Sequence, residues 1–252
     1  MVLRAYAMDD TDAMADLMHT NDWRQFEVDW SDIAPYLYTY SPLPMMTFTL
    51  QHIAAKGYAM NIVIFIRHGE SESNVTHTLT SDIDKSPLTE EGVKQVEALA
   101  KTIPKGIRID GFYTSPVLRA VQTAKILGKR LGMEPRIDKR LWERHMGDLN
   151  NATFGSTDEL TEAMMEEIRS GFKKGMESWE SLQGRLKSFA YSVKGITVAV
   201  SHHDPILSAM GIVDGKYDDY DIGTRFGTAT ATSIDFENRR ILEIGKPGFP
   251  KL

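Results

Sequence analysis

Two histidines in this chain follow apolar runs and stand beside groups that suit phosphate binding. The run Ile62–Ile66 holds five β-branched or aromatic residues and leads directly into Arg67, His68 and Gly69. Such a run, without polar alternation, is typical of a strand buried on both faces. Open α/β sheets bind ligands at the turn after a strand, so His68 is expected to face a ligand. Arg67 adds a permanent cation with forked donors that match phosphate, and Gly69 would let a ligand oxygen approach the main chain.

The second histidine, His202, follows a similar apolar run, Ile196–Ser201. If the two strands are neighbours in a parallel sheet, their carboxyl ends lie at the same edge and the two imidazoles meet. We therefore expect His68 and His202 to belong to one site. After His202, Asp204 is expected to cap a helix whose first position is Pro205.

A further cation is predicted at the start of another helix. Residues 112–116 indicate a short strand and a turn, and residues 117–131 carry apolar positions at helical spacing. Arg119 lies in the first turn of that helix, where backbone N–H groups favour an anion. Because an arginine there opposes the helix dipole, its position makes sense if a negatively charged group binds beside it.

Alternating patterns predict the elements that must position these residues. Thr89 is expected to cap a helix, and the last two strands are expected to pair as an antiparallel edge. The pattern indicates an α/β fold, a three-layer sandwich with a mostly parallel sheet and helices on both faces. The remaining predicted strands are 111–114, 134–137, 230–235 and 241–244, and the remaining helices are 90–103, 159–172 and 179–193.

Five segments also carry a family likeness, in the same order as in that family. They are Arg67–Glu70 with Asn74, Ser86–Gly92, Tyr113–Ala124, Leu141–Gly147 and Val200–His202. Together they resemble the histidine phosphatase superfamily, branch 1, whose fold is phosphoglycerate mutase-like. The likeness covers roughly residues 60–245.

The resemblance implies a mechanism that suits these side chains. His68 would attack a phosphomonoester as the nucleophile and form a phosphohistidine. Arg67, Arg119 and His202 would bind the oxygens of the transferring group, and Asn74 would add a hydrogen bond. Phosphoryl transfer depends on positioning and charge stabilisation, so this cationic cluster can replace a metal ion, and no metal is expected.

The acid of the reaction would be Glu143. To protonate the leaving group and then activate water near neutral pH, its carboxyl needs a pKa that is raised by burial. A backbone carbonyl near Gly69 is expected to hold the tautomer of His68. His203, which stands where the family usually has glycine, and Arg144 are weaker candidates for substrate contacts.

We expect a metal-independent phosphomonoester hydrolase without a cofactor. The alternative is a phosphoglycerate mutase that depends on 2,3-bisphosphoglycerate, and a third reading is a phosphate-binding scaffold without turnover. The short stretch between Glu143 and His202 favours the hydrolase, because such mutases carry a long insertion there. The run Glu143–Gly147, in contrast, is more typical of mutases. Two departures from the family, Ser73 for an aromatic residue and Asn151 for a glycine, concern the shape of the substrate.

The composition of the chain narrows the compartments and the partners that suit it. The chain has no cysteine, a net charge of −6, no apolar run of membrane length and no signal-peptide pattern. A cytoplasmic enzyme for a small phosphorylated metabolite is expected, with neither nucleic acid nor membrane as a partner. The sequence indicates neither which phosphorylated metabolite is the substrate nor whether the chain forms a homodimer.

The charge is concentrated near the N-terminus. Residues 1–59 carry eight acidic residues against three basic ones and are rich in aromatic residues. They form either a helical appendage to the catalytic domain, residues 60–252, or a segment ahead of a true start at Met60.

Overall fold

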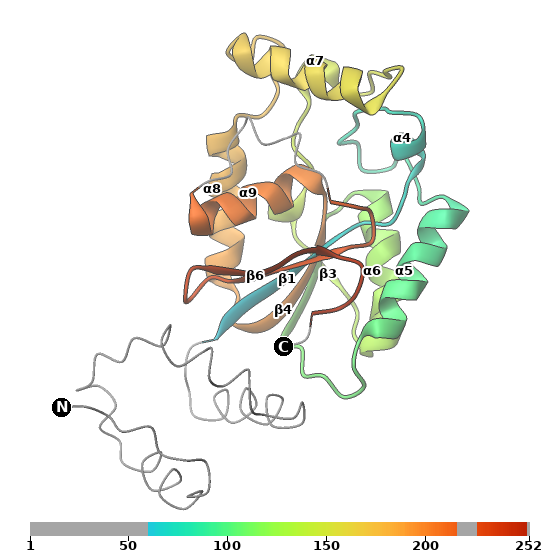
Figure 1. Cartoon of the computed structure of the whole chain (residues 1–252), viewed down its shortest axis with the longest axis vertical. Coiled ribbons are helices and arrows are strands. Elements are labelled where there is room, and N and C mark those ends of the chain that lie inside the picture. The colour runs from blue at the N-terminus through green and yellow to red at the C-terminus, as the bar shows by residue number, and fades with distance from the viewer. Residues whose placement is uncertain (1–59, 216–225, 251–252) are drawn as a thin grey trace, which may run out of the picture. The chain divides into compact units, whose positions relative to one another are not determined.

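The computed structural model describes residues 60–215 and 226–250 (Figure 1). Both readings of residues 1–59 lie outside this part of the chain and stay predictions. No helix in the described ranges is long and apolar enough to cross a membrane.

A six-stranded mixed sheet forms the centre of the domain, with the strand order β3-β2-β4-β1-β5-β6. The first four strands in this order run parallel, whereas β5 is antiparallel to β1 and β6 is antiparallel to β5. The predicted mostly parallel sheet with an antiparallel edge is confirmed. The strands are β1 Asn61–Arg67, β2 Gly111–Thr114, β3 Arg136–Ile137, β4 Gly195–Ser201, β5 Ala231–Asp235 and β6 Arg240–Lys246.

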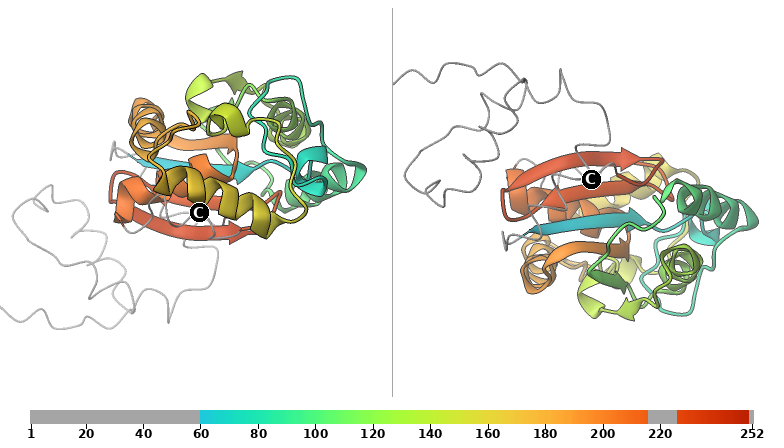
Figure 2. Two further views of the ribbon diagram at one scale, coloured as in Figure 1. Left: turned by 90° about the horizontal axis from the view of Figure 1, so that it is seen from above. Right: turned by 90° about the horizontal axis from the view of Figure 1, so that it is seen from below.

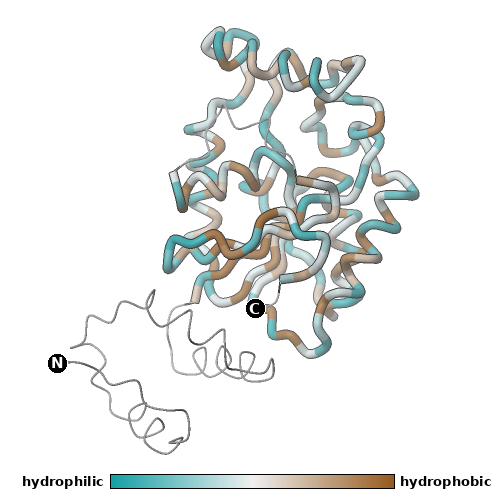
Figure 3. The backbone as a smooth tube through the Cα atoms, in the orientation of Figure 1, coloured by the Kyte–Doolittle hydropathy of each residue, from teal (hydrophilic) through white to brown (hydrophobic). Residues whose placement is uncertain are grey.

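Helices cover both faces of the sheet, as predicted (Figure 2). One core cluster joins the sheet to α5 and α6, and a second joins it to α8 and α9. The apolar runs of β1 and β4 lie between these layers, and hydrophobic stretches of the chain lie in the middle of the domain (Figure 3). The helices are α4 Glu72–Val75, α5 Glu90–Thr102, α6 Leu118–Leu131, α7 Thr157–Arg169, α8 Trp179–Ser192 and α9 His203–Asp214.

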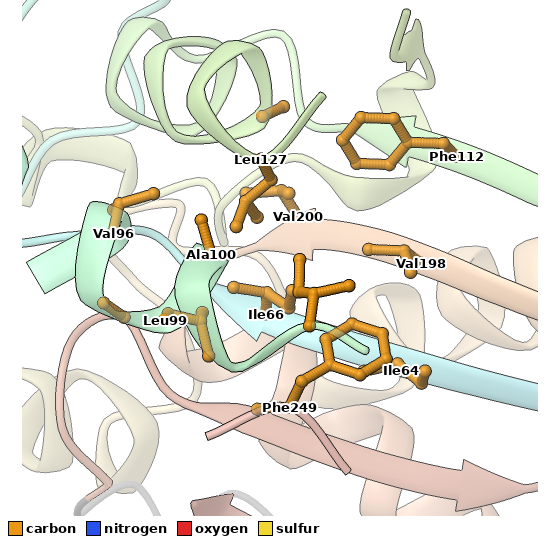
Figure 4. Close-up of a cluster of buried hydrophobic side chains, with 14 of the residues drawn as sticks. Ile64, Ile66, Val96, Leu99, Ala100, Phe112, Leu127, Val198, Val200 and Phe249 are labelled. Atoms are coloured by element: carbon orange, nitrogen blue, oxygen red, sulfur yellow. The ribbon is translucent and has the colours of Figure 1, made fainter. Parts of the chain in front are cut away.

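Strand β1 contributes to both clusters because successive side chains of a strand point to opposite faces. Ile62, Ile64 and Ile66 lie in the cluster with α5 and α6. Figure 4 labels Ile64 and Ile66 among the residues of this cluster. Val63 and Phe65 lie in the cluster with α8 and α9. This burial on both sides explains the apolar run without alternation, and it fixes the backbone that ends at His68.

The ends of two helices test the capping predictions. Thr89 caps α5, since its hydroxyl accepts a hydrogen bond from the Gly92 N–H at 2.9 Å. The prediction that Asp204 caps α9 is wrong, because His202 is the N-cap and Pro205 is the third helical residue. His202 follows β4 directly and has the extended backbone of an N-cap residue, so α9 begins at the next residue, His203.

Two glycines let α5 pack against the turn after His68. A Cβ on Gly69 would lie 2.5 Å from the Gly92 carbonyl oxygen, and a Cβ on Gly92 would lie 1.9 Å from the Glu70 carbonyl oxygen. Gly69 therefore serves helix packing, which differs from the expected approach of a ligand oxygen. The contact holds the turn that carries the histidine.

Replacing Gly92 by alanine is expected to lower the free energy of unfolding by about 1–3 kcal/mol, because the added methyl group meets main-chain atoms that cannot move aside. Urea unfolding would measure the change. The matched control is Gly184→Ala in α8, where an added Cβ meets nothing within 4 Å. That variant should be neutral or more stable, since alanine favours a helix. Equal stability of both variants would contradict the packing role.

Candidate active site

Parallel pairing of β1 and β4 brings the two histidines together. Arg67 and Ser201 are opposite each other in the register, and the His68 N–H donates to the Ser201 carbonyl oxygen at 3.1 Å. The imidazole centroids of His68 and His202 lie 5.1 Å apart. The predicted meeting of these two side chains is confirmed.

The tautomer of His68 follows from its neighbours. Its Nδ1 lies 2.7 Å from the carbonyl oxygen of Gly69, which can only accept, so Nδ1 carries the proton. The expected backbone carbonyl is therefore present. Nε2 then holds the lone pair and accepts a hydrogen bond from Arg119 Nε at 3.1 Å. Burial, followed by the charges of Arg119 and Arg67, lowers the pKa of His68 and keeps the imidazole neutral.

Arg119 extends from the first turn of α6 into this site and is only 3% exposed. Its Nη2 donates to the Thr80 carbonyl oxygen at 3.0 Å, while Nη1 has no hydrogen-bond partner among the described residues. Burial lowers its pKa to about 10, so the guanidinium stays charged at neutral pH. A buried cation with an unused donor beside a nucleophilic nitrogen is suited to a phosphate oxygen.

Glu143 lies in the segment that follows a short 3₁₀ helix, Lys139–Leu141, and its carboxyl lies close to His202 and Arg119. Its Oε2 lies 3.8 Å from His202 Nδ1 and 3.9 Å from Arg119 Nη2, and the residue is 9% exposed. Burial and the charge of Asp204 raise the pKa of this carboxyl to about 7. Its two protonation states are therefore both accessible near neutral pH, as an acid that later acts as a base requires.

His202 is completely buried. Its Nε2 lies 2.8 Å from the Ser115 hydroxyl oxygen, whereas Nδ1 has no hydrogen-bond partner within the described ranges. Burial, followed by the charge of Arg119, lowers the pKa of His202. Nδ1 faces Glu143 and is the atom that could contact a bound phosphate. Ser115 directly follows β2, so the rule that ligand sites lie after parallel strands could have found it.

Arg67 and Asn74 are the other two residues that we expect to bind phosphate. Arg67 ends β1, and its guanidinium donates to the Phe226 carbonyl oxygen and lies over the ring of that residue. Asn74 Oδ1 accepts hydrogen bonds from the N–H and the hydroxyl of Ser71 at 3.0 and 2.9 Å. This cap of α4 uses the amide oxygen, which leaves the amide nitrogen as the group that can donate to phosphate.

The two weaker candidates contact other parts of the protein. Arg144 is completely buried, donates to the Glu177 carbonyl oxygen at 2.7 Å and lies 3.8 Å from the Asp204 carboxylate. These contacts indicate a structural role and do not support the predicted substrate contact. The His203 ring stacks on Phe226 at 4.7 Å, and its Nδ1 lies 2.9 Å from Asp204 Oδ1.

A cleft of about 550 Å³ adjoins the site. Ser81 and Trp142 line it, and each is the chain neighbour of a site residue, Thr80 and Glu143. The indole N–H of Trp142 donates to the Ser81 carbonyl oxygen at 2.6 Å and ties the two walls together. The other lining residues are Asp82, Ile83, Asp84, His145, Met146, Gly147, Asn150 and Gly175.

The loop that carries Thr80 is held by Asn151, the residue that stands where a glycine was expected from the resemblance. Asn151 has a φ of 68°, the left-handed region that favours glycine and that asparagine tolerates. Its side chain donates to Asp82 Oδ2 at 3.0 Å, and its N–H donates to the Leu79 carbonyl oxygen. The asparagine thus keeps the backbone turn and also fastens the loop that carries Thr80.

Nowhere in the described ranges do three or more His, Cys, Asp or Glu side chains gather as a metal site requires. The positive charges around His68 come from side chains of the protein, Arg67 and Arg119.

Known proteins resemble the chain in sequence and in fold. A 2,3-bisphosphoglycerate-dependent phosphoglycerate mutase from Thermoplasma acidophilum is 37% identical over 191 residues, which covers 74% of this chain and 92% of the relative. The crystal structure of TTHB049 from Thermus thermophilus is 26% identical with a TM-score of 0.56, and it covers 72% of this chain and 97% of that one. A mycobacterial glucosyl-3-phosphoglycerate phosphatase shares the fold at 23% identity and a TM-score of 0.61, covering 74% and 99%.

The family model described as histidine phosphatase superfamily, branch 1, matches residues 63–242. This range includes every candidate site residue described above. The chain belongs to branch 1 of the histidine phosphatase superfamily.

Proposed function

We propose that the chain is a metal-independent phosphomonoester hydrolase that forms a phosphohistidine on His68. The observation that carries the proposal is the position of the His68 Nε2 lone pair. It faces the buried guanidinium of Arg119, and the Glu143 carboxyl, with a pKa of about 7, lies 3.9 Å from that guanidinium. Nucleophile, charge stabilisation and proton donor are thus within reach of one phosphoryl group.

In the first half of the proposed reaction, the Nε2 lone pair attacks phosphorus and the bond from phosphorus to the leaving oxygen breaks. Arg119, Arg67, His202 and Asn74 bind the phosphoryl oxygens, and protonated Glu143 gives its proton to the leaving alkoxide. The Gly69 carbonyl accepts the Nδ1–H throughout and stabilises the positive charge that develops on the ring.

In the second half, the Glu143 carboxylate takes a proton from water as the oxygen attacks phosphorus. The P–N bond breaks, its electron pair returns to His68, and inorganic phosphate leaves. The cationic side chains perform the charge stabilisation that a metal ion provides in other phosphotransferases. We infer a small phosphorylated metabolite as the substrate, with its organic part in the adjoining cleft.

A mutase is the second candidate, and one comparison favours it. The relative that is 37% identical over 92% of its own length carries the name of a phosphoglycerate mutase. Such an enzyme returns the phosphoryl group to a sugar acid and needs 2,3-bisphosphoglycerate to supply phosphorylated enzyme. The histidine chemistry is the same in both cases, so the acceptor of the phosphoryl group distinguishes them.

One pair of assays tests the proposal. The purified chain should hydrolyse p-nitrophenyl phosphate at a rate that excess EDTA leaves unchanged, because its own cations bind the phosphate. 3-Phosphoglycerate should then be offered with and without 2,3-bisphosphoglycerate. Isomerisation of 3-phosphoglycerate that depends on the bisphosphate would show that the chain is a mutase and would contradict the proposed hydrolase. Loss of hydrolysis in EDTA would contradict the metal-independent mechanism, and inactivity in every assay would leave a scaffold.

A further inference from the structure

One arginine on α8 binds the main chain on which Glu143 is mounted. Arg185 Nη1 donates to the carbonyl oxygens of Arg140 and Trp142, both at 2.8 Å. Its Nη2 donates to the carbonyl oxygen of Glu143 itself at 3.1 Å. One guanidinium thus satisfies three acceptors within four residues of chain, which only a planar donor group of this size can do.

A carboxylate fixes the direction of that guanidinium. Glu177 accepts from Arg185 Nε through Oε1 and from Nη2 through Oε2, both at 2.9 Å. The side chains are only 17% and 8% exposed, so solvent weakens this bidentate pair little. Glu177 also holds the far side of the segment, since its N–H donates to the His145 carbonyl oxygen and its own carbonyl accepts from Arg144.

The segment needs this support because it has no ladder of its own. The 3₁₀ helix ends at Leu141, and residues 142–146 belong to neither helix nor strand. Without partners from elsewhere, their carbonyl groups would be left unsatisfied in a largely buried region. The place of the Glu143 carboxyl, close to His202 and Arg119, therefore depends on the contacts that hold this backbone.

We propose that Arg185, oriented by Glu177, is a positioning residue that sets the Glu143 carboxyl against the leaving group and, later, against the attacking water. The inference rests on the proposed function. Arg185 touches neither phosphate nor leaving group in this scheme. It acts through the main chain of the acid.

The test compares two substrates that differ in their need for an acid. The p-nitrophenolate leaving group is a stable anion and departs without a proton. The phenolate leaving group of phenyl phosphate is less stable and needs a proton from the acid. In Arg185→Lys, kcat/KM for phenyl phosphate should fall about 10²-fold, the usual cost of a misplaced catalytic group. For p-nitrophenyl phosphate, kcat/KM should hold while kcat and KM fall together, because hydrolysis of the phosphohistidine slows.

A second variant and a control keep the outcome clear. Glu177→Gln should give the same pattern more weakly, since it removes the charge that orients the guanidinium. Lys187→Met removes another cation from α8, at an exposed position, and should change neither substrate. Equal loss on both substrates, or no loss on either, in Arg185→Lys and Glu177→Gln would overturn the positioning role. Wild-type protein that never becomes phosphorylated on His68 would refute the proposed function instead.

Discussion

Replacing His68 by asparagine is expected to lower kcat/KM for p-nitrophenyl phosphate by at least about 10⁴-fold, because it removes the nucleophile itself. The amide can still donate to the Gly69 carbonyl, but it offers no lone pair at the position of Nε2. Arg119 and His202 would remain in place and bind phosphate without turning it over. The measurement is steady-state hydrolysis together with acid-quenched labelling of the protein by a phosphate donor, in which the variant should take up no label.

The matched control is His77→Asn, which makes the same change at a histidine outside the cluster. The φ of His77 is 49°, a backbone conformation that asparagine tolerates, so this variant should fold and retain activity. Label on another residue of the His68 variant, or activity near that of the wild type, would show that a different group accepts the phosphoryl group. Both outcomes are visible in one experiment.

Much of the fold could be predicted because its strongest patterns are local. The apolar runs in β1 and β4 indicate strands that are buried on both faces of a sheet, and Thr89 indicates the start of α5. A parallel pairing of neighbouring strands was then enough to bring His68 and His202 together. The strands and the helix start need only local patterns, whereas the meeting of the two histidines also needs β1 and β4 to be neighbours in the sheet.

The parts of the site that could not be predicted depend on contacts with main-chain atoms. Arg185 donates to three main-chain carbonyl groups. Because every residue has a carbonyl group, no pattern of side chains in the sequence predicts these contacts. The position of Gly69 after a strand predicts a ligand contact, but its close approach to Gly92 arises only when α5 packs on the turn. The sequence favours Asp204 as the cap because aspartate is a common N-cap residue, whereas α9 begins at His203, directly after the extended His202.

Replacing Glu143 by glutamine is expected to lower kcat/KM for phenyl phosphate by about 10²- to 10⁴-fold, the usual contribution of a general acid. The amide cannot give a proton to the leaving oxygen. For p-nitrophenyl phosphate the first step should survive, and the variant should release about one equivalent of nitrophenol per site before turnover slows. That burst follows from the second half-reaction, in which the missing carboxylate can no longer activate water.

The pH dependence follows from the raised pKa of this carboxyl. Burial and the charge of Asp204 raise the pKa of Glu143 to about 7, while Arg119, the Arg144 N–H and His203 act in the opposite direction. The protonated form is the donor, so the wild-type ratio of kcat/KM for phenyl phosphate to that for p-nitrophenyl phosphate should fall as pH rises above about 7. The ratio removes the titration of the phosphate group, which both substrates share.

In Glu143→Gln this ratio should no longer change with pH, since the amide does not titrate. Glu97→Gln, at an exposed position of α5, should keep the wild-type profile and serves as the matched control. A ratio that still falls above about pH 7 in the Glu143 variant would assign the titration to another group. His68 is a poor candidate for that group, because burial and the charges of Arg119 and Arg67 hold its pKa well below neutral pH.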